Sequence, residues 1–338
     1  MKIKKRTISD IAQLLAYILL VVVIYNCVSG YSMRILNISF IYAIVALGLV
    51  IMLGMTGMLN FAGISFMGIG AFVVGNVCTG RHGFVLSSTL GLVLAILISA
   101  LLGCLIGAAL LRLNGTFFTF GTIALVQIFQ TLFINYVPLF GGNSGISNID
   151  TFSAGSFEIK GNSSWFLFVA VIVGVVAIMV TRLGRTKLGR AMYSVRDDEI
   201  VAKSLGINVF RTKLIAFCLQ AALSGLAGGL YAMMNKYIGS DLFTWTKAST
   251  IVIMAMVGGI TSPLGSIIGA IIVTALPETF RGLQQYLRLA YGVAIIILMI
   301  FMPMGIASIG STAKALISKV KNKGGRISNY AIKGGETH

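Results

Sequence analysis

Long apolar runs, separated by short polar gaps, limit what this chain can fold into. The first run, 11–29, carries no charge, and a helix of its length crosses a hydrocarbon core of about 30 Å. We expect it to be a retained span, because no small-residue cleavage site follows it. Further apolar runs lie at 38–55, 63–79, 84–111, 116–135, 164–181, 212–234, 248–277 and 289–307. With 57% hydrophobic and only 10% charged residues, the chain is predicted to be a polytopic membrane protein.

The run 248–277 is interrupted by Gly258-Gly259 and Ser262-Pro263, so it is either one kinked span or two short segments. Basic residues concentrate in cytoplasmic loops, and this bias favours two segments, because the basic tail after 307 then lies inside. The outer regions then hold a minority of the 26 basic residues, namely Arg34, Arg81, Lys160, Lys236, Lys247, Arg281 and Arg288. We therefore predict an all-α fold of about 9–10 transmembrane or half-spanning helices, with cytoplasmic N- and C-termini.

The runs predict one transmembrane domain over 1–307, which includes a charged cytoplasmic loop at 182–213. The remaining residues, 308–338, form a basic cytoplasmic tail whose composition is typical of disorder. The Gly-, Ser- and Asn-rich loop 136–163 would lie on the external face. The net charge of +17 arises mainly in the gaps between spans, which indicates contact with a lipid bilayer and not with nucleic acid. The four cysteines form no CxxC pair and indicate apolar packing.

The interiors of the apolar runs contain no Asp, Glu, Lys or Arg. A charge at mid-bilayer costs about 2.5–3.5 kcal/mol and is usually kept for ion or proton coupling, so its absence argues against an ion-driven carrier. We also find no HExxH, GxSxG or Walker A sequence, and we expect no catalytic residue, no metal site and no cofactor bound by this chain. If the protein moves a solute uphill, the energy must come from a partner.

Two stretches mix glycine with polar residues near membrane depth: 56–63 and 114–122. A helix broken there usually lines a cavity, because its freed backbone groups need polar partners. The alternative is that both stretches are loops at the membrane edge. Gln127, Gln130 and Gln220 either line the same path or bond between helices. The candidate substrate-path residues are Asn60, Asn114, Thr119, Thr122 and Gln127.

The charged run 182–213 holds eight basic residues and three consecutive acids, 197–199. We predict a short helix from Ser194 to Gly206, capped by Ser194 or Asp197 and ended by the glycine. Ile200, Val201 and Leu205 would share one side of it, with Lys203 on the other. Such a helix either lies on the membrane surface or docks onto a partner.

The stretch RDDEIVAKSLGIN within 189–232 resembles the cytoplasmic coupling loop and next helix of ABC-transporter permeases of the branched-chain amino acid, LivM-like family. Thr56–Phe72, Leu113–Ile128, Gly141–Ile146 and Gly258–Gly305 resemble further family segments in the same order. The resemblance covers about 40–306, although Gln127 stands where the family often has Glu. The coupling-loop positions that match are Arg196, Asp197, Glu199, Ile200, Ala202, Leu205, Gly206, Ile207 and Asn208.

The resemblance implies a multi-pass permease subunit of the bacterial cytoplasmic (inner) membrane. Its partners would be cytoplasmic ATPase subunits that bind ATP, a second permease subunit, identical or different, and an extracytoplasmic solute-binding protein. The ATPase-coupling residues would be Arg196, Asp197, Glu199, Ala202 and Gly206.

The cargo implied by the resemblance is a small polar solute, with branched-chain or other amino acids first. The alternatives within the class are nucleosides, sugars, and urea or amides. Two readings from other classes remain: an ion-coupled secondary transporter, and a non-transporting scaffold or membrane enzyme.

Overall fold

The computed structural model describes residues 17–18, 21–22, 25, 30–79, 81, 86–113, 115–154, 157–159, 161–279 and 292–293. Apart from isolated positions, the expected spans at 11–29 and 289–307 lie outside the described residues, as do Asn114 and the tail 308–338.

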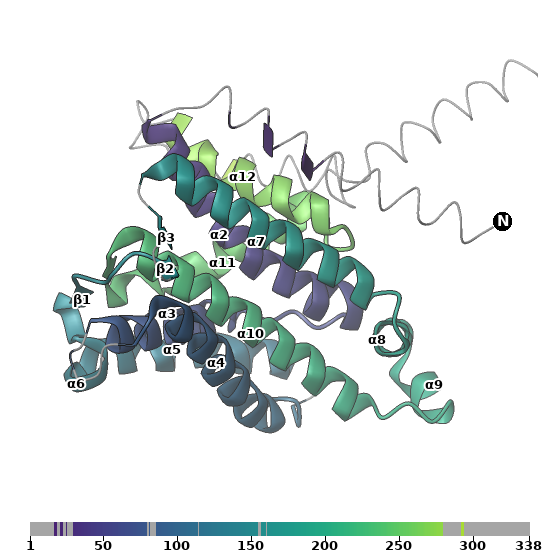
Figure 1. Ribbon diagram of the computed structural model, residues 1–338. Coiled ribbons are helices and arrows are strands. Elements are labelled where there is room, and N and C mark those ends of the chain that lie inside the picture. The colour runs from purple at the N-terminus through teal and green to yellow at the C-terminus, as the bar shows by residue number, and fades with distance from the viewer. Residues whose placement is uncertain are drawn as a thin grey trace, which may run out of the picture.

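The described chain is helical with four very short strands (Figure 1). The helices are α2 (Tyr31–Leu49), the π-helix η1 (Val50–Met55), α3 (Gly63–Cys78), α4 (Ser88–Leu110), α5 (Thr116–Asn135), α6 (Val137–Phe140), η2 (Gly142–Ser144), α7 (Asn162–Leu183), α8 (Lys187–Asp197), α9 (Glu199–Ser204), α10 (Val209–Asn235), η3 (Ser240–Leu242), α11 (Trp245–Gly258) and α12 (Pro263–Thr279). The strands are β1 (Ile146–Ser147), β2 (Ser153–Ala154), β3 (Phe157–Glu158) and β4 (Tyr237–Ile238).

Five of these segments are long and apolar enough to cross a membrane: α2 with η1, α4, α5, α7 and α10. The shorter α3, α11 and α12 are also apolar. The prediction of an all-α polytopic membrane protein is thus confirmed. The two-segment reading of 248–277 is confirmed as well, because α11 ends at Gly258 and α12 begins at Pro263.

Helix α2 starts at Tyr31, well before the apolar run at 38. Two polar side chains in this first part are held by other helices. Arg34 donates to Asn235 Oδ1 of α10 at 3.2 Å, and Asn37 Nδ2 donates to the carbonyl of Asn162 at 3.0 Å. The hydrophobic pattern alone therefore placed the start of this helix too late.

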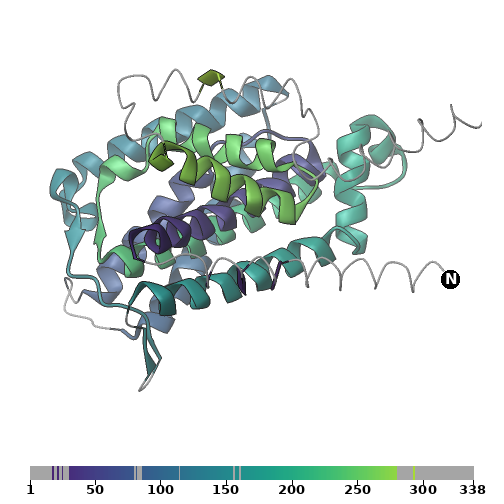
Figure 2. The same cartoon turned by 90° about the horizontal axis from the view of Figure 1, so that it is seen from above.

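Helix α2 lies at the centre of the molecule, where it packs against α7, α10, α11 and α12 (Figures 1 and 2). Its 18-residue apolar window is 89% buried, against 22% for α5 and 28% for α4. A helix that is apolar all round fits this central position, while the apolar outer faces of α4 and α5 suit contact with lipid or another chain.

Small residues allow α10 to pack directly on the backbones of α3 and α4. A Cβ on Gly70 of α3 would lie 2.2 Å from the carbonyl oxygen of Gly225, and one on Gly103 of α4 would lie 2.4 Å from Ala221 Cβ. Neither contact tolerates a larger side chain without movement. Small residues at such positions let helices approach closely in a membrane.

The two ends of the helical bundle differ. At one end α8 and α9 project from the bundle, and at the other lie α6 and the strands (Figures 1 and 2). There β1 pairs antiparallel with β4, with Ile146 opposite Ile238. The polar loop 136–163 and the charged loop 182–213 therefore occupy opposite ends, as their assignment to opposite faces requires.

Candidate substrate path and coupling loop

The helical chain breaks between η1 and α3, at residues 57–62. Asn60, at the centre of this break, is 1% exposed. Its Nδ2 donates to Gln220 Oε1 of α10 at 2.8 Å, and its Oδ1 accepts from the amide of Ala62 at 2.9 Å. The side chain thus supplies one of the polar partners that a backbone break within an apolar bundle needs. Gln220 thus forms a hydrogen bond between helices, which was one of the two roles expected for it from the sequence.

Two threonines of α5 bind the same break. Thr119 Oγ1 donates to the carbonyl of Leu59 at 3.2 Å, and the amide of Phe61 donates to Thr122 Oγ1 at 3.3 Å. The Thr122 hydroxyl donates in turn to the carbonyl of Thr119 at 2.8 Å. The two stretches singled out in the sequence therefore meet in space, and Asn60, Thr119 and Thr122 form one polar cluster. Gln127 is exposed further along α5 and makes none of these contacts.

Three buried polar atoms near this cluster have no hydrogen-bond partner among the described residues: Gln220 Nε2, Ser224 Oγ and Ser65 Oγ. A Cβ on Gly63 would lie 3.3 Å from the first of these atoms and 3.5 Å from the second. Both atoms therefore lie next to the start of α3. Such atoms can hydrogen-bond to water or to a polar solute.

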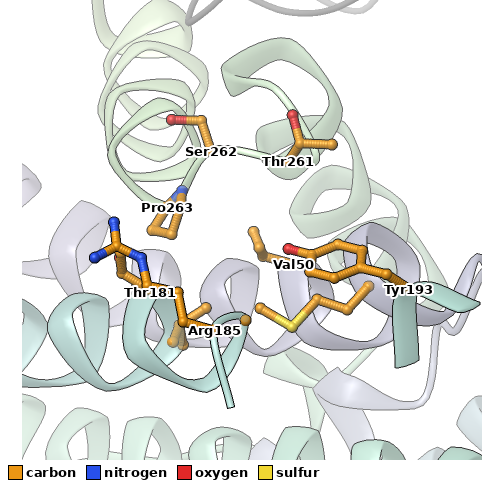
Figure 3. A pocket seen from close by; sticks show the side chains of 10 residues that line it. Val50, Thr181, Arg185, Tyr193, Thr261, Ser262 and Pro263 are labelled. Atoms are coloured by element: carbon orange, nitrogen blue, oxygen red, sulfur yellow. The ribbon is translucent and has the colours of Figure 1, made fainter. Parts of the chain in front are cut away.

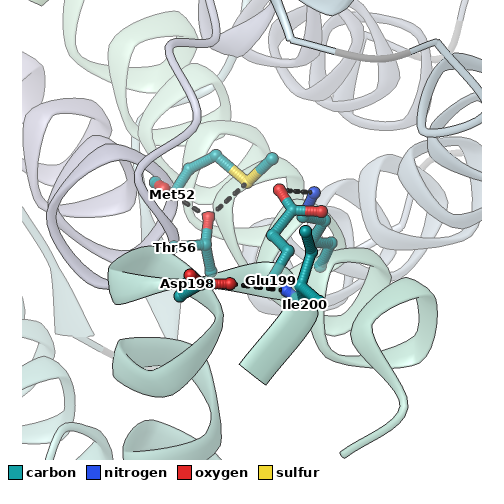
Figure 4. A network of polar contacts seen from close by, with 6 residues as sticks. Met52, Thr56, Asp198, Glu199 and Ile200 are labelled. Atoms are coloured by element: carbon teal, nitrogen blue, oxygen red, sulfur yellow. Dashed lines mark hydrogen bonds and ion pairs between the residues drawn. The ribbon is translucent and has the colours of Figure 1, made fainter. Parts of the chain in front are cut away.

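The charged loop forms two helices, so the prediction of one helix from Ser194 to Gly206 is wrong. Asp198 has an extended backbone (φ −161°, ψ 118°) that separates α8 from α9. Its Oδ1 accepts from the amide of Ile200 at 2.7 Å (Figure 4) and from that of Val201 at 3.0 Å. Asp198 is thus the N-cap of α9. The helix before it begins at Lys187, where the Thr186 hydroxyl accepts from the Gly189 amide at 3.1 Å.

The predicted helix end at Gly206 is confirmed. Gly206 has φ +79°, and the amide of Ile207 donates to the carbonyl of Ala202 at 3.0 Å, which closes the helix with a left-handed residue. Ala202 itself is 1% exposed and packs with Val195, Val209 and Ile207. This small apolar cluster fixes α9 against α8 and the start of α10.

The outer surface of α9 is apolar. Ile200, Val201 and Leu205 are 77%, 54% and 71% exposed. Asp197, at the end of α8, is exposed as well. Ile200 and Val201 on this projecting helix of six residues, with Leu205 directly after it, form a small patch of the kind that other protein chains cover.

Two charged side chains connect this loop to the transmembrane helices. Arg196 Nη1 donates to the carbonyl of Gly54 at the end of η1. Lys213 Nζ on α10 binds Glu199 Oε1 of α9 at 2.5 Å (Figure 4). Of the five predicted coupling residues, Arg196 therefore reaches the end of η1, just before the break. Glu199 pairs within the chain, Ala202 is buried, and Asp197 and Gly206 remain at the surface.

Residues 31–302 match the family described as branched-chain amino acid transport system permease component. The chain is 31% identical to the high-affinity branched-chain amino acid transport system permease protein LivM of Salmonella typhimurium, over 82% of this chain and 70% of that protein. It is 31% identical to LivM of Escherichia coli over 87% of this chain and 74% of that protein. It is also 29% identical to the permease protein LivH of Escherichia coli, over 78% of this chain and 90% of that protein. No solved structure matches the chain.

Proposed function

The chain belongs to the branched-chain amino acid transport system permease family, and we propose that it is one permease subunit of an ATP-driven importer of branched-chain or other amino acids. The observation that carries this proposal is the bond from Arg196 to Gly54, because it joins the projecting charged loop to the end of η1, directly before the break that leads to the polar cluster. A docking event at the loop thereby acts on the candidate path.

In this proposal, cytoplasmic ATPase subunits bind ATP and cover the exposed apolar patch of α9, formed by Ile200, Val201 and Leu205. Closure of the ATPase pair moves α8 and α9 together, since the cluster around Ala202 holds them as one unit. Asp197 is exposed beside the patch and contacts the ATPase, and Gly206 sets the end of α9. The loop, like both termini, lies on the cytoplasmic side.

The solute passes along the surface that includes the break and the start of α5. Asn60, Thr119 and Thr122 hold the wall of the path through their hydrogen bonds. The nearby Gln220 Nε2 and Ser224 Oγ are polar atoms that can bind a small polar solute. Asn114, which precedes these threonines in the sequence, stays a candidate for the same path. Gln127 is exposed on α5, and it faces a second permease subunit across the path.

Two further partners complete the proposed assembly. Because the chain is similar to proteins named LivM and to proteins named LivH, the second subunit is either another copy of this chain or a related permease. A solute-binding protein delivers the solute at the end that carries α6 and β1, which faces outward from the inner membrane of a bacterium.

The test is uptake into proteoliposomes that contain the full chain with its partner permease, ATPases and binding protein. We expect ATP-dependent uptake of leucine, isoleucine or valine. Uptake of a nucleoside, a sugar or urea in their place would show that the cargo is one of the alternatives within the class. Transport driven by an ion gradient without ATP would contradict the proposal and favour a secondary transporter.

A further inference from the structure

A cavity of about 270 Å³ opens at the end of the bundle that carries the charged loop. It lies between the last turn of α7, α8, η1 and the α11–α12 connection, and Figure 3 shows its lining. One part of the wall is apolar, with Val50, Met55 and Val180. The rest is polar, with Thr181, Arg185, Tyr193, Thr261 and Ser262.

The polar wall consists of hydrogen-bond donors. Arg185 brings a permanent positive charge, and Tyr193, Thr261 and Ser262 bring hydroxyl groups from two other segments. The Ser262 oxygen accepts from the amide of Gly265 at 3.2 Å, which leaves the hydroxyl hydrogen available to donate. None of the described residues that line the cavity is acidic.

The first turn of α12 adds to the positive potential in the cavity. Pro263 lines the cavity as the first residue of that helix, and a helix N-terminus carries a partial positive charge. Guanidinium, hydroxyl donors and a positive helix end together attract an anion, and oxygen atoms on a tetrahedral phosphate can accept from several of them at once.

Close packing gives the cavity a defined shape. A Cβ on Gly189 of α8 would lie 2.1 Å from the carbonyl oxygen of Leu183, so α8 crosses directly over the end of α7. As a result the Tyr193 hydroxyl lies 3.1 Å from the place where a side chain on Gly184 would begin. Tyr193 is therefore held in place by the fold, while Arg185 is an exposed side chain at the edge of the cavity.

We propose that this cavity binds the phosphate group of an anionic ligand, which bridges α7, α8 and the α11–α12 connection. Its volume lies just below the range of about 300–1,000 Å³ of drug-sized sites, which suits a phosphate-bearing headgroup. Its place at the basic, charged-loop end is where pockets between membrane helices meet anionic lipid headgroups. A free phosphate compound has the same chemistry. This site is distinct from the polar cluster at Asn60 and does not depend on the cargo.

The experiment uses the full chain in nanodiscs of phosphatidylcholine alone, of phosphatidylcholine with phosphatidylglycerol, and of phosphatidylcholine with added inorganic phosphate. Thermal unfolding and native mass spectrometry report stabilisation and bound lipid. The variants are Arg185→Gln and Tyr193→Phe. Arg182→Gln is the matched control, because Arg182 is an exposed basic residue three positions earlier, at the end of α7, that does not line the cavity.

We expect phosphatidylglycerol to raise the unfolding midpoint of the wild type and to be retained on the chain, with about tenfold weaker binding in Arg185→Gln and little change in Arg182→Gln. Stabilisation by inorganic phosphate alone, lost in Arg185→Gln, would assign the site to a free phosphate compound. If neither phosphate source stabilises the wild type, or if both arginine variants lose binding equally, the proposal is overturned. Tyr193→Phe keeps the ring in place and should weaken binding less than Arg185→Gln does.

Discussion

The guanidinium of Arg196 donates a hydrogen bond to the carbonyl oxygen of Gly54, across 142 positions of sequence. This carbonyl belongs to the last turn of η1, where helix carbonyls have no partner of their own and a positive side chain is favourable. Six residues later, Asn60 holds the break to α10. A displacement of α8 therefore reaches the polar cluster through a very short piece of chain.

Replacing Arg196 tests this link. Arg196→Gln removes a charged hydrogen bond worth about 1.5–3 kcal/mol, and we expect ATP-driven uptake to fall at least tenfold while insertion and ATP hydrolysis persist. Uptake and ATPase activity of the same proteoliposomes give the measurement. The control is Lys187→Gln, at the exposed first residue of the same helix. Normal uptake by the Arg196 variant would show that the bond carries no coupling.

Charge-swap variants of the Glu199–Lys213 pair test whether Glu199 positions α9 or contacts the ATPase. Glu199→Lys places two positive charges together and is expected to uncouple transport from ATP hydrolysis. The swapped double variant, Glu199→Lys with Lys213→Glu, restores the pair with opposite orientation. If uptake recovers in the swap, the carboxylate positions α9. If it does not, Glu199 meets the ATPase directly.

The buried bond between Asn60 and Gln220 contributes to stability. Asn60→Leu leaves Gln220 Oε1 without its partner, and we expect a loss of about 1–3 kcal/mol in the free energy of unfolding. Adding Gln220→Leu should cost less than the two single losses combined, because the second change removes the orphaned amide. Thermal unfolding in detergent measures both, and Asn143→Leu, at an exposed position, is the control. Additive losses would contradict a shared bond.

Thr119 is expected to influence which solute is carried. Thr119→Val removes the hydroxyl that binds Leu59, loosens the wall of the path and should change relative uptake across a panel of amino acids. Thr119→Ser keeps the hydroxyl and should resemble the wild type. Uptake assays with competing solutes provide the readout. An unchanged solute preference in Thr119→Val would show that Thr119 does not shape the path.

Two cysteines test the packing of α4 on α10. The side chains of Cys104 on α4 and Cys218 on α10 are neighbours, and a Cβ on the adjacent Gly103 would lie 3.8 Å from Cys218 Cα. Mild oxidation with copper phenanthroline and oxygen should therefore join them in a disulfide, visible by mass spectrometry of the digested chain. Cys104→Ser abolishes the cross-link. Absence of the cross-link in the wild type would place the two helices further apart.

Features that follow from local pattern were predictable. The bounds of α5 agree with the apolar run 116–135, and Gly258 and Pro263 marked the gap between α11 and α12. The end of α9 at Gly206 followed from the one residue type that adopts a left-handed conformation easily. Each of these signals lies within a few residues of the feature that it specifies.

The rest depends on tertiary contacts that no short pattern contains. Three consecutive acids allowed several caps, and Asp198 takes that position because α8 runs on to Asp197 and packs as one unit with α9. The partner of Arg196 is a backbone carbonyl, which has no signature in the sequence. The meeting of the break with α5, and the exposed position of Gln127, depend on how whole helices pack.

The bond between Asn60 and Gln220 joins positions 160 residues apart, which has a consequence for biogenesis. At about 5–20 residues per second, the ribosome needs roughly 10–30 s to make α10 after the break has been synthesised. During that interval Asn60 and the broken backbone lack their native partner on α10. This part of the bundle is therefore completed only after the second half of the protein has been made.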